Sequence, residues 1–503
     1  MEKLSYSTLN KLGYDGFLQK DAPVKVLQFG EGGFLRAFVD YFFDLANEKA
    51  GYNGKIAVVQ PIATGRMKEI NAQDGLYTVY LRGLNNGEKV VEKRIVSSID
   101  KVINPYEDFD ALMAYATDEN IRFIVSNTTE AGIAYDPSCA LDDKPASSFP
   151  AKVTQVLYER FNKCGGKDAR GFVFLSCELI DHNGDELKRC VNCYIDQWKL
   201  SAEFKSWVNE DNVFCSTMVD RIVTGYPRAE ADALNEENGY IDDNLDTGEI
   251  FAVWYIEGPE YLNDELPFKK IGLPIIVTPD CRPFKQEKVR ILNGVQTTIT
   301  LASYLAGHDI MRFALKDKNV ADFASNVVYK EIIPTLPYSE EFPFTKEDLL
   351  EYARVIFDRL NNPFIDHQLM AISLNTTSKW RARVLPSLLE YANTFGKVPV
   401  GLTLGFCAYL CFYHGFELRE NGLVNTRDGK EYLINDDRAI LEFYYEHRND
   451  TLSELAEVVM AKEDWWGLDL RTVPTFLSEC KRLLEKIEKE GMAEAIAEAA
   501  ENN

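Results

Sequence analysis

The chain has 503 residues, a formal net charge of -24 and 27% charged residues. This length exceeds the usual ceiling for one hydrophobic core, so two domains are expected. The strong acidity and the lack of any Lys/Arg-rich run argue against a nucleic-acid or anionic-membrane partner.

Targeting signals do not stand out in this sequence. Residues 1–17 contain no apolar stretch before a small-residue cleavage site, so no secretory signal is predicted and the protein is expected to be cytoplasmic. The longest uncharged run, residues 398–413, is shorter than the roughly 20 residues that a membrane-spanning helix needs. It also contains Pro399 and Gly401, so we predict a buried core helix and no membrane partner.

The first half alternates short β-branched runs with helical patterns. The strand-like runs are KVLQF, KIAVVQP, IRFIVSNTT, GFVFLSCEL and FAVWYIEG. Strands that alternate with helices at this spacing are typical of a parallel, doubly wound sheet. The sequence therefore predicts an α/β, Rossmann-like N-terminal domain at residues 1–280.

The second half has a different character. From about Pro283 the chain shows long amphipathic helical patterns, such as KEDLLEYARVIFDRL and SECKRLLEKIEKEGMAEAIAEAA, and few strand signals. We predict a mainly α-helical C-terminal domain at residues 281–503, with the boundary within residues 270–285. The Ala/Glu-rich C-terminal tail is predicted to be a frayed helix.

The first strand of the N-terminal half ends in a glycine-rich turn. In VLQFGEGGFLRAF, residues 26–38, the run Gly30-Glu31-Gly32-Gly33 leads directly into a helical pattern, so backbone N–H groups and the helix terminus can meet a pyrophosphate. Leu35 stands where GxGxxG has its third glycine, so an ordinary strand-to-helix turn is the alternative. Its place as the first strand-turn-helix favours dinucleotide binding.

The residues after the second strand-like run bear on the choice of cofactor. That run ends in VVQP, without a carboxylate for the ribose hydroxyls, and Arg66 follows in ATGR. A missing acid and a nearby arginine would permit a 2′-phosphate, so NAD and NADP both stay open. A solvated loop charge is the alternative interpretation of Arg66.

The cysteines give little reason to expect a metal site. Ten cysteines without a repeating framework indicate reduced, mostly buried thiols. The CxxC of Cys190 and Cys193 lies in a helical pattern without a second CxxC, so two small residues on a helix face are favoured over a metal site.

Residues 288–298, KVRILNGVQTT, carry polar side chains in an otherwise apolar segment. On a continuous helix at about 100° per residue, Lys288 falls on an apolar stripe. That stripe is formed by Leu292, Val295 and Ile299. An adjoining polar flank is formed by Asn293, Gln296, Thr297, Thr300 and Tyr304. A desolvated lysine can accept a proton near neutral pH, and an asparagine can donate to an oxygen on which charge develops. The alternative is that Lys288 snorkels to water and Asn293 ends a turn.

Seven segments carry a resemblance to a known family. They are the glycine turn with Phe34 and Arg36, VSNTTEAGI (125–133), SSFPAKVT (147–154), CELIDHNGD (177–185), MVDRIVTGYPR (218–228), KVRILNG (288–294) and SKWRARVLPSL (378–388). In these segments the sequence resembles the polyol-specific long-chain dehydrogenases, the mannitol dehydrogenase family. CELIDHNGD and VDRIVTGYP resemble its sugar-acid branch.

The resemblance implies a set of functional residues. That family uses a nicotinamide cofactor and no metal, so we expect NAD, with NADP not excluded, and a small sugar-acid substrate. Lys288 would be the general acid/base and Asn293 would hold the reacting oxygen, with Asp220 and Lys379 close to the substrate. The expected cofactor-binding residues are Gly30, Glu31, Gly32, Gly33, Phe34, Asn127 and Thr128.

Two positions depart from the family pattern. Leu179 stands where polyol members carry a second asparagine, a difference that the sugar-acid branch shares, and Gln296 stands where the family has a histidine. Gln296 can donate and accept hydrogen bonds without changing protonation state, so we predict that it binds a substrate hydroxyl. A fructuronate or polyol dehydrogenase, or a nucleotide-binding sensor without turnover, are the alternative functions.

A cluster of basic residues is suited to an anionic substrate. Lys379, Arg381 and Arg383 lie together in SKWRAR. A hexuronate carboxylate needs a cation, so at least one of the three is expected to face inward. A solvated basic stripe is the alternative for the other two.

Overall fold

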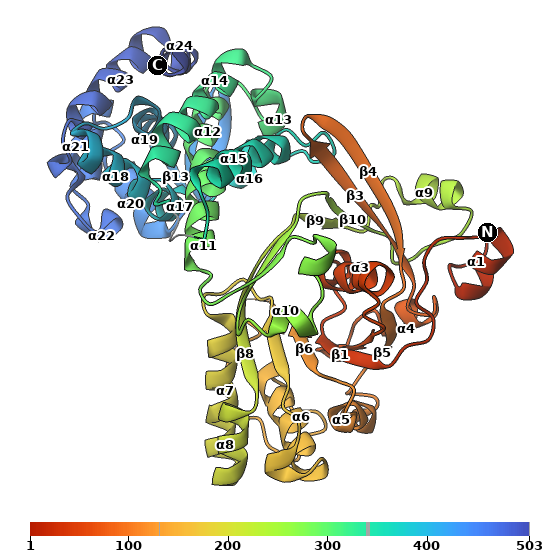
Figure 1. Cartoon of the computed structure of the whole chain (residues 1–503). Coiled ribbons are helices and arrows are strands. Elements are labelled where there is room, and N and C mark those ends of the chain that lie inside the picture. Colours follow the sequence, from red (N-terminus) through yellow and green to blue (C-terminus); the bar gives the residue numbers. More distant parts are fainter. Residues whose placement is uncertain (130, 339–342, 502–503) are drawn as a thin grey trace. The chain divides into compact units, whose positions relative to one another are not determined.

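A computed structural model describes residues 1–129, 131–338 and 343–501. The chain forms two compact units (Figure 1), of which unit 1 comprises Met1–Arg82 and Lys89–Cys281. Unit 2 comprises Arg282–Asn503 together with Gly83–Glu88, the tip of a hairpin. Within unit 2 the backbone N–H of Gly87 donates to Asp358 Oδ1 at 3.1 Å.

Unit 1 is built around an eight-stranded sheet. Its strands, in spatial order, are β12 (Ile275–Thr278), β11 (Val253–Glu257), β8 (Val213–Asp220), β7 (Val173–Ser176), β6 (Phe123–Ser126), β1 (Val24–Phe29), β2 (Lys55–Val59) and β5 (Ile99–Ile103). All five strand-like runs of the sequence lie in this sheet. Neighbouring strands pair in parallel except β8 and β11, which are antiparallel. The expected parallel, doubly wound sheet is confirmed, and its one antiparallel pair, β8 with β11, was not predicted.

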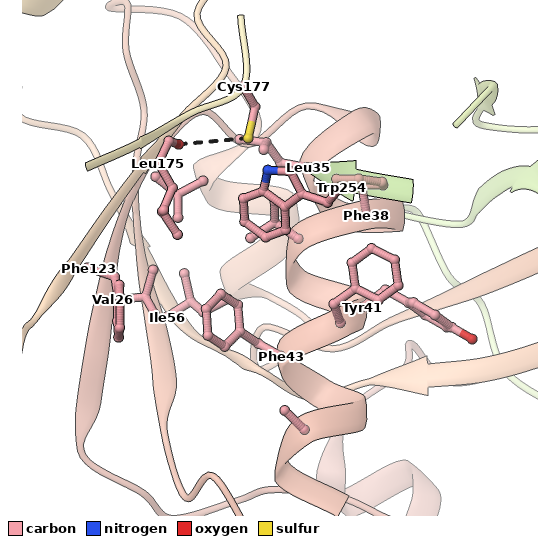
Figure 2. Packing of buried hydrophobic residues seen from close by; sticks show 14 of the residues in the cluster. Val26, Leu35, Phe38, Tyr41, Phe43, Ile56, Phe123, Leu175, Cys177 and Trp254 are labelled. Atoms are coloured by element: carbon pink, nitrogen blue, oxygen red, sulfur yellow. Dashed lines mark hydrogen bonds between the residues drawn. The ribbon is translucent and has the colours of Figure 1, made fainter. Parts of the chain in front are cut away.

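Side chains alternate between the two faces of this sheet. Val26 packs in one core cluster, whereas its neighbour Leu27 packs in the other. Figure 2 shows the first cluster, in which Val26 lies beside Ile56 and Phe123. The rings of Phe38 and Trp254 pack in the same cluster, with centroids 5.7 Å apart. Each fully buried side chain of this kind contributes about 1.5–3 kcal/mol.

Helices cover both faces, which makes the domain doubly wound. The first face is covered by a continuous helix of α2 (Gly33–Leu35), π-turn η1 (Arg36–Asp40) and α3 (Tyr41–Ala50). The helices on the second face are α5 (Phe109–Thr117), α6 (Phe149–Lys163), α7 (Asn183–Gln197) and α8 (Ala202–Glu210). The other helices of unit 1 are α1 (Tyr6–Leu12), α4 (Met67–Asn71), η2 (Gly166–Asp168), α9 (Ala231–Asn238), α10 (Leu262–Glu265) and η3 (Lys269–Ile271).

A second sheet was not predicted. Its strands, in spatial order, are β4 (Glu88–Val96), β3 (Tyr77–Asn85), β10 (Asp246–Glu249) and β9 (Val223–Gly225). β3 and β4 form the hairpin whose tip belongs to unit 2.

Unit 2 is mainly helical, as expected. Its helices and turns are α11 (Arg282–Lys288), η4 (Val289–Asn293), α12 (Gly294–Leu305), α13 (Met311–Ala314), α14 (Lys318–Asn326), η5 (Val327–Ile332), η6 (Ile333–Thr335), α15 (Lys346–Leu360), α16 (Leu369–Ile372), α17 (Thr376–Arg383), α18 (Leu385–Phe395), α19 (Val400–Tyr413), α20 (Arg438–Glu446), α21 (Leu452–Met460), α22 (Glu463–Trp466), η7 (Leu470–Thr472), α23 (Phe476–Glu490) and α24 (Met492–Glu501). A small antiparallel sheet was missed; its strands are β13 (Glu417–Arg419), β14 (Gly422–Arg427) and β15 (Lys430–Ile434).

The apolar run at residues 398–413 forms the buried helix α19, as predicted. It packs closely on α12, because a Cβ added at Gly405 would lie 2.7 Å from Thr298 Cγ2. The buried carboxylate of Glu331 accepts the backbone N–H groups of Gly401 and Leu402 at the start of α19. No described helix is both long and apolar enough to cross a membrane.

The described part of the C-terminal tail, Met492–Glu501, is a packed helix, so the prediction of fraying was wrong there. Gly491, at φ +95°, separates α23 from α24. Ile496 and Ala499 are buried, and the Asn326 side-chain amide donates to the Ala499 carbonyl at 3.1 Å. The alanines leave a flat apolar face that packs against the rest of unit 2, whereas composition alone suggested a solvated tail.

Candidate active site

The strand order of unit 1 reverses between β1 and β6. From β1 the chain proceeds to β2 and β5 on one side, and β6, β7 and β8 follow on the other. In open α/β sheets ligands bind at such a switch point, outside the carboxyl ends of the strands. Gly30 follows β1 and Asn127 follows β6, and a Cβ added at Gly30 would lie 3.3 Å from the Asn127 carbonyl oxygen. The structure therefore brings the predicted cofactor loops together.

The three glycines of the turn differ in whether the structure requires a glycine at that position. Gly30 has φ +125°, a conformation that L side chains rarely adopt. A Cβ at Gly33 would lie 3.0 Å from Asp246 Oδ2. Gly32 has an ordinary φ of -67°, and its Cβ would meet no protein atom within 4 Å. Backbone conformation thus explains Gly30 and packing explains Gly33. Neither explains Gly32, whose open peptide leaves room for the approach of a dinucleotide pyrophosphate.

The helix after the turn begins without a side-chain cap. Gly32 is its N-cap and supplies no side-chain acceptor, so the first N–H groups remain available to an anion. Phe34 is half-buried and stacks on Phe38 at a centroid distance of 5.0 Å. Its expected contact with the cofactor stays a prediction.

Arg66 is not the solvated loop charge that one interpretation suggested. Its guanidinium donates to the Asp243 carbonyl at 2.6 Å and to Asn244 Oδ1 at 3.0 Å. Its backbone N–H donates to Glu31 Oε1 at 3.4 Å, and burial raises the pKa of Glu31. Arg66 therefore ties the glycine turn to residues 243–244.

Glu178 is a functional candidate that sequence reasoning missed. Its buried carboxylate accepts the backbone N–H of Thr128 at 3.0 Å and the hydroxyls of Thr128 and Ser126, each at 3.1 Å. Burial raises the pKa of Glu178. Thr129 has φ +87°, which is strained for a β-branched residue. Glu178 thus holds a strained loop at the switch point. In the sequence, a carboxylate that closely follows an apolar strand was the feature that could have identified it.

Two further residues lie at carboxyl ends of strands. Asp220 is the last residue of β8 and is buried. Leu179 follows β7 with a side chain that is 69% exposed. The position of the second asparagine of polyol members is therefore apolar and open.

Lys288 and Asn293 flank a π-turn in unit 2. Lys288 ends α11, Asn293 ends η4, and the Gly294 N–H donates to the Val289 carbonyl five residues back. Such a turn inserts one residue into the α-helical repeat. The continuous helix that we expected is thus wound differently at this point.

The π-turn changes which residues share a face. In an unbroken α-helix, Asn293 and Gln296 would lie about 140° and 80° from Lys288; with one inserted residue both lie within about 40° of it. The exposure of these side chains agrees with a shared face, since Lys288, Asn293 and Gln296 are all half-buried. The residues of the expected apolar stripe are buried instead: Leu292, Val295 and Ile299. Placing Lys288 on that stripe was therefore wrong, because the π-turn rotates it onto the face of Asn293 and Gln296.

The basic residues of SKWRAR lie on α17, which packs against the start of α12. A Cβ at Gly294 would lie 3.1 Å from the Arg383 carbonyl oxygen. Lys379 and Arg383, one helical turn apart, are half-buried, whereas Arg381 is exposed. Lys379 Nζ donates to the Ile372 carbonyl at 2.8 Å. Burial lowers the pKa of Lys379, and the charge of Arg383 lowers it further.

The described residues contain no group of three or more His, Cys, Asp or Glu side chains arranged to hold a metal ion. All ten cysteines are free. Cys190 is buried and Cys193 half-buried on α7, in the helix that the sequence predicted.

Comparison with known proteins defines the family. The mannitol dehydrogenase Rossmann domain matches residues 24–270, and the mannitol dehydrogenase C-terminal domain matches residues 280–488. The chain belongs to the mannitol dehydrogenase family. The resemblance seen in the sequence is confirmed, and this mannitol dehydrogenase family member is an oxidoreductase that acts on CH–OH groups.

The similar sequences are full-length matches. Altronate oxidoreductase of Yersinia enterocolitica serotype O:8 / biotype 1B is 42% identical over 497 residues, which covers 97% of this chain and 99% of the relative. Altronate oxidoreductase of Pectobacterium carotovorum subsp. carotovorum is also 42% identical, over 496 residues with the same coverage. These relatives place the chain among the sugar-acid and polyol dehydrogenases of the family.

Solved structures confirm the expected fold. Substrate-free D-sorbitol dehydrogenase superposes with a TM-score of 0.81 at 21% identity, covering 98% of this chain and 100% of the other. Pseudomonas fluorescens mannitol 2-dehydrogenase, solved as a ternary complex with NAD and D-mannitol, superposes with a TM-score of 0.67 at 22% identity, covering 100% of both chains.

Proposed function

We propose that the protein is an NAD-dependent altronate oxidoreductase that interconverts tagaturonate and altronate, with Lys288 as its general acid/base. Full-length identity of 42% to altronate oxidoreductases supports the substrate. The observation that carries the mechanism is the π-turn, which puts Lys288 and Asn293 on one half-buried face of a helix.

The carboxyl ends of β1 and β6 supply the cofactor site in this proposal. Gly30–Phe34 would hold the pyrophosphate, and Asn127 and Thr128 would contact the cofactor beside it. When bound, the nicotinamide would accept or donate the hydride. The guanidinium of Arg66 already bonds Asp243 and Asn244, which leaves it poorly placed for a 2′-phosphate and favours NAD over NADP.

Proton transfer is assigned to Lys288. In alcohol oxidation its neutral amine removes the hydroxyl proton, and in ketone reduction its ammonium returns a proton to the carbonyl oxygen. Asn293 donates a hydrogen bond to that oxygen as negative charge develops. Gln296, on the same face, orients a substrate hydroxyl, and Asp220 at the end of β8 also contacts the substrate.

Recognition of the substrate's carboxylate is assigned to α17. Lys379 and Arg383 form a half-buried basic pair beside α12, and a carboxylate there would gain charge-assisted hydrogen bonds. The exposed Arg381 has no part in this site.

A substrate and cofactor panel tests the proposal. Oxidation of NADH and of NADPH is followed with tagaturonate, fructuronate and uncharged ketoses. We expect the highest kcat/KM with tagaturonate and NADH. Faster reduction of fructuronate or a ketose would reassign the substrate within the family. Tight NADH binding without turnover of any of these compounds would make the protein a nucleotide-binding sensor.

A further inference from the structure

Arg290 lies inside the π-turn, between Lys288 and Asn293, and its side chain is only 5% exposed. Its Nε donates to Ser387 Oγ at 2.5 Å, and Nη2 donates to Thr335 Oγ1 at 2.7 Å. Ser387 is on α18 and Thr335 ends η6. One side chain therefore ties the π-turn to two other elements of unit 2.

The guanidinium is held by neutral partners. Arg290 forms no ion pair with any described carboxylate, and both hydroxyls that it meets are buried. Burial lowers the pKa of Arg290 to about 10, so it stays charged at neutral pH. The charge of the exposed Glu390, which lines a pocket together with Arg290, raises the pKa of Arg290 in part, although these two described residues form no direct ion pair. A buried cation that is not paired directly with a carboxylate costs stability. The two hydroxyls carry no net charge and so offset little of this desolvation cost. They do fix the orientation of the guanidinium plane.

We propose that Arg290 is a positioning residue that holds the π-turn in register and thereby aligns Lys288 with Asn293 for proton transfer. This inference rests on the roles proposed above for those two residues. Without the anchor, η4 can return to α-helical winding, which would rotate Lys288 by about 100° relative to Asn293. A misplacement of 1 Å in an active site can cost about 10²-fold in rate.

A pocket of about 380 Å³ opens beside this anchor. Its described lining includes Arg290 and Thr335, with Gln286 and Glu390 at the exposed part. A small cation can therefore reach the place that the guanidinium would leave if the side chain were truncated.

Steady-state kinetics of Arg290→Met provide the first test. We expect kcat to fall at least about tenfold, with KM and the NADH Kd changed less than about twofold, because only alignment is lost. The kcat of Arg290→Lys should lie between those of the wild type and Arg290→Met, since a single ammonium cannot bond both hydroxyls in a fixed plane. Arg160→Met is the matched control: Arg160 is equally buried, donates to the Ile121 carbonyl in unit 1, and should affect stability alone.

Chemical rescue separates positioning from stability. Guanidinium at tens of millimolar should restore kcat of Arg290→Ala at least about threefold, far below its denaturing concentration range. Tetramethylguanidinium, with its donors blocked, should not. Equal effects of the two cations, or a kcat loss for Arg160→Met as large as that for Arg290→Met, would overturn the proposal.

Milder variants guard against misfolding. Ser387→Ala and Thr335→Val each remove one partner of Arg290 and should each give a smaller kcat loss, with the thermal midpoint close to that of the wild type. A crystal structure of Arg290→Met gives a readout that does not need turnover. If the π-turn persists there with Lys288 and Asn293 unmoved, the positioning role is wrong, even if the wild type reduces tagaturonate. If the wild type reduces no tested substrate while the π-turn is lost in the variant, the proposed function fails and the anchor stands.

Discussion

At the scale of single residues, the glycine turn contains two glycines with a structural reason, Gly30 and Gly33, and one without, Gly32. Gly32 has an ordinary φ and open space above its Cα, so Gly32→Val should fold normally. In the proposed cofactor site the side chain would block the approach of the pyrophosphate, so we expect NADH affinity to fall at least about tenfold. Titration of NADH fluorescence measures this. Gly30→Ala is the contrast, because φ +125° makes it destabilising; unchanged NADH affinity in Gly32→Val would refute the assignment.

Lys288→Ala tests the general acid/base. General acid–base catalysis typically contributes about 10²- to 10⁴-fold, so kcat should fall within that range. Altronate oxidation by the variant should recover partly as pH rises, because hydroxide replaces the missing base. Lys397→Ala, an exposed lysine before α19, is the control and should keep full activity. A loss of less than about tenfold at Lys288 would contradict proton transfer by this residue.

At the scale of elements, α17 presents one basic face inward and Arg381 outward. Lys379→Met should raise KM for tagaturonate at least about tenfold more than KM for an uncharged ketose, because only the uronate loses an ion pair. Arg381→Met removes the same charge from the exposed side of the helix and should leave both KM values nearly unchanged. Equal losses for both substrates in Lys379→Met would place the carboxylate elsewhere.

The start of α19 makes stability depend on pH. Burial raises the pKa of Glu331 from 4.5 to about 7. Between these pH values the folded state keeps a proton that the unfolded state releases, so this group's contribution to stability falls as pH rises to about 7 and is constant above it. The change is at most about 3 kcal/mol. Glu331→Gln should therefore gain stability relative to the wild type from pH 5 to 7, as measured by thermal midpoints; parallel profiles would exclude this carboxyl as the source.

Elements with an even repeat were predictable from the sequence, whereas breaks in the repeat were not. The five strand-like runs, the helix KEDLLEYARVIFDRL and the buried α19 follow directly from periods of two and 3.6 residues. A helical wheel with a constant angle per residue cannot show the π-turn at residues 289–293. Lys288 was therefore assigned to the wrong face of the helix. The strands β13–β15 are short and half-exposed, which leaves little apolar signal.

The candidate site shows the same division. Its proposed cofactor turn and its proposed lysine and asparagine could be selected from the sequence because they lie in short contiguous motifs. Glu178 and Arg290 were missed because their importance depends on partners far along the chain, Thr128 and Ser387. Burial and hydrogen bonding across such separations are properties of the folded chain.

At the scale of the whole molecule, the charge of -24 opposes an anionic substrate. The Debye length falls from about 30 Å at 0.01 M salt to about 8 Å at 0.15 M, so salt screens this distant repulsion. We expect kcat/KM for tagaturonate to rise about twofold or more over that range, relative to an uncharged ketose. A fall with salt would mean that the local cations of α17 dominate the approach of the substrate.

The hairpin tip Gly83–Glu88, which belongs to unit 2, depends on residues that are synthesised much later. The Gly87 N–H pairs with Asp358, 271 positions further along the chain. At about 5–20 residues per second, a ribosome needs roughly 10–60 s to make that partner. Unit 1 can collapse around its sheet during this interval, but Gly83–Glu88 must wait for the chain that completes their surroundings. Translation speed through the middle of the message therefore sets how long this hairpin tip lacks its partner Asp358.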